Sequence, residues 1–327
     1  MNRSALDCLI GAAFALAMNG ALAQPARKPA LIGVLSANFP PPREDACYDA
    51  FRKGMRDYGY VEGRDVVYEP RWSELGVKRM EPLAADLVAR KVDLIMVGTA
   101  RAAIAAKAAT GAIPIVMGPV NDPVELGLVS SLGRPGGNVT GFALFSREYT
   151  VKRLEFVREL AGPGAKVSIL TNPTHSTIER KYYDSAARVL SLEASLMPVR
   201  GPEDLAGAFE TAVRNGSKAV VLTGDPLFAR ERNRIAKLAL THRLPVISGD
   251  AGIEITGILA YYGTAPWELC GAAAKHVDRI LKGANPADLP VEQATRIESV
   301  INLKTAQAIG VRLPQSLLLR ADRVIEW

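Results

Sequence analysis

The chain has 327 residues, 48 % of them apolar and only 6 % aromatic, and its 40 basic and 34 acidic side chains give a formal net charge of +6. This length exceeds what one hydrophobic core usually supports, and the composition suits an α/β protein rather than a disordered or fibrous chain. The basic residues are scattered among acids, as in "VKRLEFVREL", and form no long basic run. Nucleic acid is therefore not an expected partner.

The first residues have the pattern of a cleavable signal peptide. Arg3 precedes an apolar run at 8–18, and "ALA" at 21–23 has the small-x-small pattern of a signal-peptidase site. The apolar run is too short to span a bilayer comfortably. We therefore expect residues 1–23 to be removed and the exported chain to begin at Gln24 and work in the periplasm.

Strands and helices alternate through the first half of the chain, with short connections. The expected strands are short apolar runs, and the expected helices carry apolar residues at helical spacing. In chain order we expect a strand at 30–36, a helix at 44–58, a strand at 64–72, a helix at 77–91, a strand at 92–98, a helix at 101–110 and a strand at 113–118. This βα repeat is typical of a parallel, doubly wound sheet with right-handed crossovers.

The turn-rich stretch "GRPGGNVTG" at 133–141 interrupts this alternation, which then begins again. The second half is expected to contain a helix at 147–160, a strand at 165–172, a helix at 178–193, a strand at 195–200, a helix at 203–214 and strands at 218–224, 244–248 and 257–263. Two comparable α/β halves are the simplest account of this pattern.

Polar or small residues follow the strands of both halves. In "IPIVMGPVNDPVELG" at 113–127, an apolar strand runs directly into Asn121, Asp122 and Pro123. Asn121 or Asp122 can cap the next helix, with Pro123 in its first turn, which would leave backbone amides pointing at the strand end. One interpretation is an ordinary strand-to-helix turn. The other is a ligand site, because ligands of open α/β sheets bind outside the carboxyl ends of the strands. If the two halves face each other across these ends, their polar residues line one cleft.

No enzyme or metal-site motif stands out in the sequence. The turn after the first strand is "SANFPPPRE" rather than G-x-G-x-x-G, and the P-loop, G-x-S-x-G, H-E-x-x-H and C-x-x-C patterns are absent. The three histidines, His175, His242 and His276, have no partner at metal-ligand spacing. We therefore expect a protein that is not an enzyme and has no metal and no cofactor.

Two cysteines, Cys47 and Cys270, remain once the leader is removed. In an oxidising compartment they could form a disulfide. Their spacing does not require one, and Cys47 also fits as a small apolar residue on the first helix. Both interpretations stay open.

Six longer segments match a known family in their order and spacing. They are "YGYVEGRDVVYEPRW", "LAADLVARKVDLIMVGT", "AAKAATGAIPIVM", "NDPVELGLVSSLGRPGGNVTG", "DPLFARERNRIAKLALTHRLP" and "ILKGANPADLPVEQATRIESVINLKTAQAIG". Together they resemble the substrate-binding proteins of an ABC-type importer family related to tryptophan- and phenylalanine-binding lipoproteins. The resemblance runs from 30 to 327 and implies a type I periplasmic-binding-protein fold, with two Rossmann-like, doubly wound parallel-sheet α/β lobes joined by a three-stranded hinge.

The resemblance also implies a domain map. The chain is expected to cross between lobes near 142–147, 262–266 and 300–302. The first lobe would then hold 30–144 and 265–299, and the second 145–264 and 300–327. The implied assembly is a monomer that delivers a small-molecule solute to an ABC permease in the inner membrane.

The expected ligand site joins the strand ends of the two halves. Helix N-terminal amides after Ser36, Thr99 and Thr171 would hold an anionic group of the solute. The full set of expected ligand-binding residues is Ser36, Ala37, Gly98, Thr99, Arg101, Asn121, Asp122, Asn172, Asp225, Asp250 and Tyr261.

Three kinds of side chain would set the choice of solute. Asp225 or Asp250 is available for an amine, and Tyr261 or Tyr262 for an apolar body. Arg101 stands in "GTARA" where relatives read G-T-P-A-A, which adds a cation to the first-lobe niche. These groups predict a small amino-acid-like or carboxylated solute. The alternative function is an exported sensor or adaptor whose ligand-bound form is read by a receptor, because both functions use the same closure of the lobes.

Overall fold

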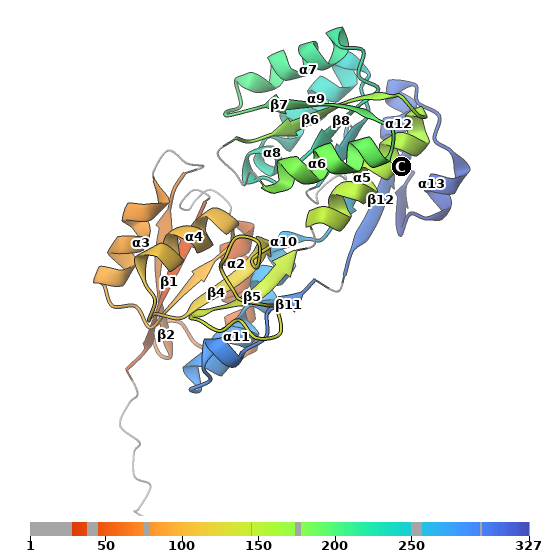
Figure 1. The fold of residues 1–327 in the computed structure, drawn as a ribbon. Coiled ribbons are helices and arrows are strands. Elements are labelled where there is room, and N and C mark those ends of the chain that lie inside the picture. The colour runs from red at the N-terminus through yellow and green to blue at the C-terminus, as the bar shows by residue number, and fades with distance from the viewer. Residues whose placement is uncertain are drawn as a thin grey trace, which may run out of the picture.

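A computed structural model describes residues 28–37, 45–74, 79–144, 146–173, 178–249, 257–294 and 296–326. Its strands form one six-stranded and one seven-stranded sheet, and Figure 1 shows the two α/β units side by side. The expected pair of doubly wound lobes is confirmed. The expected signal peptide lies outside the described residues, and no helix within them is both long and apolar enough to cross a membrane.

The first sheet is parallel throughout and has the strand order β11-β5-β4-β3-β1-β2. Its strands are β1 (Ala30–Ser36), β2 (Val66–Trp72), β3 (Leu94–Val97), β4 (Ile115–Asn121), β5 (Val139–Leu144) and β11 (Glu292–Gln293). Because every strand runs the same way, all their carboxyl ends lie at one edge of this sheet.

Helices cover both faces of the first sheet, since successive strand residues point to opposite faces. Ile32 and Val34 pack into a core with α2, α10 and α11, whereas Leu35 packs into the core formed with α3 and α4. The bounds are α2 (Ala46–Asp57), α3 (Met80–Ala89), α4 (Ala100–Ala109), α10 (Pro266–Ala272), α11 (Ala274–Leu281) and the short 3-10 helix η1 (Pro286–Asp288).

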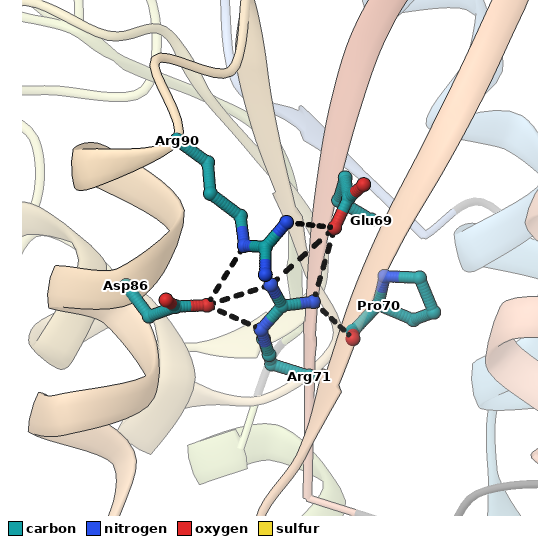
Figure 2. A network of polar contacts seen from close by, with 5 residues as sticks. All are labelled: Glu69, Pro70, Arg71, Asp86 and Arg90. Atoms are coloured by element: carbon teal, nitrogen blue, oxygen red, sulfur yellow. Dashed lines mark hydrogen bonds and ion pairs between the residues drawn. The ribbon is translucent and has the colours of Figure 1, made fainter.

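The edge strand β2 is tied to α3 by a network of charges, shown in Figure 2. The Arg71 guanidinium donates to Asp86 Oδ2 at 2.6 Å and to the Pro70 carbonyl at 2.8 Å. Arg90 contacts both Glu69 and Asp86. Hydrogen bonding from Arg71 lowers the pKa of Asp86. Proline and charged side chains are typical of edge strands, because both discourage pairing with another chain.

The second sheet has the order β13-β12-β10-β9-β8-β6-β7 and is parallel except between β10 and β12. Its strands are β6 (Lys166–Thr171), β7 (Glu193–Pro198), β8 (Ala219–Leu222), β9 (Val246–Ser248), β10 (Ala260–Gly263), β12 (Glu298–Asn302) and β13 (Arg323–Ile325). The helices of this unit are α5 (Ser146–Ala161), α6 (Ile178–Val189), α7 (Asp204–Arg214), α8 (Pro226–Arg230), α9 (Arg232–His242), α12 (Leu303–Ile309) and α13 (Gln315–Leu319).

The chain passes between the two sheets three times: between β5 and α5, between β10 and α10, and between β11 and β12. After the second passage α10 packs against α2 and β4 of the first unit. The third passage ends earlier than the expected 300–302, because Glu298 and Ser299 already pair with β10 in the second sheet. That each unit moves as a rigid lobe stays a prediction.

Candidate functional site

The carboxyl edge of the first sheet presents Ser36 at the end of β1. Ser36 and Asp45 are both more than nine-tenths buried, and the Ser36 hydroxyl donates to Asp45 Oδ2 at 2.5 Å. The other Asp45 oxygen accepts from the Tyr48 amide at 3.1 Å and caps α2. Ser36 is therefore held in place by the cap of the next helix, beside Ala37.

The end of β3 combines a helix cap with a disulfide. Thr99 caps α4, where its hydroxyl accepts from the Ala102 amide at 3.3 Å. A Cβ atom on Gly98 would lie only 2.8 Å from Cys47 Sγ, so glycine leaves room for the disulfide between Cys47 and Cys270. This bond joins α2 to α10, and it decides between the two interpretations that the sequence leaves open.

Arg101 lies on the first turn of α4, half-buried. The pKa of Glu81 on α3 is lowered mainly by a hydrogen bond from its own backbone amide. The positive charges of Arg79 and Arg101 lower it further. The guanidinium of Arg101 thus lies near the start of α3. Its contact with a ligand stays a prediction.

The segment after β4 is a tight turn, and the interpretation as a helix cap is wrong. Asp122 has a φ of 45°, a left-handed conformation that is uncommon outside glycine and often marks functional positions. The Leu126 amide donates to the Asp122 carbonyl at 3.0 Å, but no helix follows in the described residues up to β5. The glycines at 127, 133, 136 and 137 explain this, because they interrupt any apolar stripe.

The second sheet brings Asn172 and Asp225 together at its carboxyl edge. Asn172 Nδ2 donates to Asp225 Oδ1 at 3.3 Å, and the same oxygen accepts from the Leu227 amide at 2.8 Å. Asp225 is 3 % exposed and caps the short helix α8, which has Pro226 in its first turn. Capping is thus an observed role of Asp225, and a ligand contact stays a prediction.

Two further expected residues fall elsewhere. Tyr261 is 2 % exposed and packs in a core of the second unit with Ile258 and Val300, so packing is its observed role. Asp250 lies outside the described residues.

A hollow of about 580 Å³ is lined by charged and apolar residues at the starts of β12 and β13. None of the expected ligand residues lines it.

A buried arginine that was not expected from the sequence lies beside the hinge. Arg153 on α5 is 6 % exposed and donates to the Tyr262 carbonyl at 3.0 Å, to the Tyr183 hydroxyl at 3.1 Å and to the Gly249 carbonyl at 3.4 Å. It thus joins the ends of β9 and β10 to α6. A signal exists in hindsight, because Arg153 lies four residues before the buried Val157, on the face of the helix that points inwards.

The two carboxyl edges meet at one contact that the sequence did not reveal. Glu125, in the turn after β4, accepts a hydrogen bond from Lys181 Nζ on one carboxylate oxygen and from the Tyr182 hydroxyl on the other. Lys181 and Tyr182 lie on α6, which follows the carboxyl end of β6. The turn after β4 and the start of α6 are therefore in contact across the two units.

Known proteins resemble the whole of this arrangement. A tyrosine-binding protein of Clostridioides difficile is 28 % identical over 275 residues, which is 83 % of this chain and 78 % of the relative. An ABC domain of Streptococcus pneumoniae in complex with L-Trp has 27 % identity and a TM-score of 0.77, covering 90 % of this chain and 100 % of that one.

A conserved domain protein of Vibrio cholerae shares the fold at 24 % identity, with a TM-score of 0.80 over 91 % of this chain and 100 % of that one. The model of the family described as ABC transporter substrate binding protein matches residues 37–325. This match spans nearly all of both α/β units and their connections. The chain therefore belongs to the ABC transporter substrate-binding protein family.

Proposed function

We propose that this chain is the periplasmic component of an ABC importer and that it captures an L-amino acid with an aromatic side chain between its two lobes. Family membership supports the transport role, and the signal-peptide pattern supports the periplasm. Two relatives of similar size, one named for tyrosine and one bound to L-Trp, support the class of solute.

The meeting of the two carboxyl edges carries this proposal. Ser36, Thr99 and Asn121 lie at strand ends on one side, and Asn172 and Asp225 lie at strand ends on the other. The contact of Glu125 with α6 supports the proposal that these two rows share one small molecule. Such a cleft between two units is where small-molecule sites are usually found.

An amino acid suits the chemistry of the two rows. The amides of Ala100 and Arg101, at the start of α4, have no acceptor within the helix, so they can donate to a carboxylate. Asp225 supplies an acceptor for the ammonium group, and Asp122 is a second candidate on the opposite side. Tyr262, half-buried at the end of β10, can cover an aromatic ring.

A thermal-shift screen of residues 24–327 tests the solute class. L-tyrosine, L-tryptophan and L-phenylalanine are expected to raise Tm, because a ligand that binds only the folded state stabilises it. Mass spectrometry of small molecules that co-purify with the protein is an independent check. If no amino acid raises Tm and none co-purifies, the proposed solute class is wrong.

Uptake by the source cells separates transport from sensing. Deleting the gene is expected to abolish high-affinity uptake of the solute that the screen identifies. Unchanged uptake, together with a lost transcriptional or motile response to that solute, would instead support the sensor or adaptor.

A further inference from the structure

The contact between Glu125 and α6 joins two parts of the protein that are covalently linked only through the three crossings. Both oxygens of the Glu125 carboxylate are used, one by Lys181 and one by Tyr182. Glu125 belongs to the first unit, whereas Lys181 and Tyr182 belong to the second. A contact of this kind exists only while the two units are close together.

Glu125 stands on a fixed turn. The Leu126 amide donates to the Asp122 carbonyl at 3.0 Å and closes the turn. Lys107 on α4 reaches over and donates to the Gly127 carbonyl at 2.6 Å, which ties the turn to the body of the first unit. Little conformational freedom of the backbone is therefore left to be lost when the Glu125 carboxylate meets α6.

The receiving helix is also fixed. Tyr183, the next residue after Tyr182 on α6, is fully buried, and its hydroxyl accepts from Arg153 Nη1 at 3.1 Å. Arg153 in turn donates to the Gly249 carbonyl at the end of β9. The side of the contact on the second unit is therefore coupled to the strand ends that face the cleft.

The charges on the two sides are complementary. Hydrogen bonds from Lys181 and then Tyr182 lower the pKa of Glu125. Burial, followed by the hydrogen bond to Glu125, raises the pKa of Tyr182, and the charges of Asp122 and Arg147 also act on this phenol. The acidic groups Glu125 and Asp122 of the first unit thus lie near the basic groups Lys181 and Arg147 of the second.

We propose that Glu125 is an interlobe latch, a positioning residue that favours the approach of the lobes by binding Lys181 and Tyr182 on α6. The latch does not need to touch the solute. Because it stabilises only the state in which the lobes are near, it shifts the equilibrium towards closure and slows the release of the solute. Its effect on the solute rests on the proposed function, whereas its effect on the distance between the lobes does not.

The distance between the lobes tests the latch without a ligand. Tyr58→Cys in the first unit and Val213→Cys in the second replace side chains that are 47 % and 45 % exposed, and both native cysteines of residues 24–327 are in the disulfide. Spin labels on the two introduced cysteines report the distance distribution by double electron–electron resonance. Glu125→Gln is expected to shift this distribution to longer distances.

Glu155→Gln is the matched control. Glu155 is 33 % exposed and bonds Lys152 within one helix, whereas Glu125 is 35 % exposed and bonds Lys181 across the units. Glu155→Gln is expected to leave the distance distribution unchanged. The charge reversal Glu125→Lys is expected to shift the distribution to longer distances. Combining Glu125→Lys with Lys181→Glu is expected to restore the parent distribution. If Glu125→Gln gives the parent distribution, or the reversed pair fails to restore it, the proposal is overturned.

A ligand measurement separates the two proposals. With L-tryptophan or L-tyrosine as the probe, Glu125→Gln is expected to raise Kd about two- to fivefold, mainly through faster dissociation, as expected for a partly exposed ion pair. If the unsubstituted chain binds neither probe, the proposed function fails, and the distance measurement still decides on the latch. Binding of a probe with unchanged Kd and dissociation rate in Glu125→Gln contradicts the latch alone.

Discussion

The two α/β units are held together internally in different ways. In the first, a disulfide joins Cys47 on α2 to Cys270 on α10, across 223 positions of sequence. In the second, Arg153 joins α5 to the ends of β9 and β10 and to α6 through hydrogen bonds. The first unit is thus cross-linked by a covalent bond, and the second by the hydrogen bonds of a buried cation.

The difference shows which unit can respond to a neighbouring change. The disulfide holds α10 against α2 however the lobes are placed, so we expect the arrangement of these two helices to stay the same when the lobes move. The hydrogen bonds of Arg153 depend on the positions of the Tyr262 and Gly249 carbonyls at strand ends beside the hinge. A shift of these carbonyls would therefore move Arg153, and Arg153 would transmit the change to α6 through its hydrogen bond to Tyr183.

Removing the disulfide is expected to have the largest effect on this comparison. Replacing both Cys47 and Cys270 by alanine should lower the unfolding free energy of the first unit by about 2 to 5 kcal/mol. In a Trp327→Phe background the remaining tryptophans are Trp72 on β2 and Trp267 on α10, so denaturant unfolding followed by tryptophan fluorescence reports this unit. An unchanged fluorescence midpoint would show that the disulfide is dispensable for the first unit.

Replacing the buried cation should weaken the second unit. Arg153→Met removes donors from two carbonyls and a hydroxyl, and buried groups that lose their partners typically cost about 1 to 3 kcal/mol. Circular dichroism during unfolding should show an earlier transition, while the tryptophan transition of the first unit stays in place. Lys152→Met, at a side chain that is 50 % exposed, is the control. Equal effects of the two substitutions would contradict the role of Arg153.

Asp225 separates capping from ligand binding. Asp225→Ala should lower the unfolding free energy by about 1 kcal/mol, because the cap of α8 is lost. Asp225→Asn should be nearly neutral for stability, since asparagine caps equally well, yet it removes the charge. If Asp225→Asn also leaves amino-acid affinity unchanged, Asp225 is a cap and does not hold the ammonium group.

His276 gives the smallest expected effect, a pH dependence in the first unit. It is 1 % exposed, its Nε2 lies 3.1 Å from the Pro290 carbonyl, and its Nδ1 has no hydrogen-bond partner among the described residues. Burial lowers the pKa of His276 below the ordinary 6.5, although the Pro290 carbonyl and Glu292 act in the opposite direction. The unfolded chain therefore takes up a proton at a higher pH than the folded chain.

The stability contributed by neutral His276 is fully present above about pH 6.5 and is lost as the pH falls from there to the lower pKa of the folded state. His276→Gln, which can still donate to the Pro290 carbonyl, should flatten the fall of unfolding free energy between pH 7 and pH 5. A slope identical to that of the unsubstituted chain would contradict this assignment.

Local pattern was enough to predict the alternation of strands and helices, because each element repeats its own period. The strand expected at 30–36 has these bounds in the structure, as β1. The helix expected at 178–193 ends at Val189, because Glu193 already belongs to β7 and pairs with Lys166 of β6. Tertiary pairing decided this boundary, and the local sequence does not contain that information.

The site was less predictable for the same reason. Thr99 and Asp225 directly precede α4 and α8 and cap them, so the local sequence contains the information for these two roles. Glu125 and Lys181 are 56 positions apart, and the two disulfide cysteines 223, so nothing local specifies either contact. Their proximity depends on how the sheets and helices are placed, which the composition and periodicity of the chain leave undetermined.

Small-angle X-ray scattering with and without a bound amino acid tests the central claim most directly. If one solute binds between the two carboxyl edges, residues 24–327 should become more compact when saturated, because the lobes close about the hinge while each keeps its fold. The radius of gyration is then expected to fall on saturation with the amino acid that binds most tightly. An unchanged radius in a sample whose occupancy is confirmed by calorimetry would contradict binding between the lobes with hinged closure.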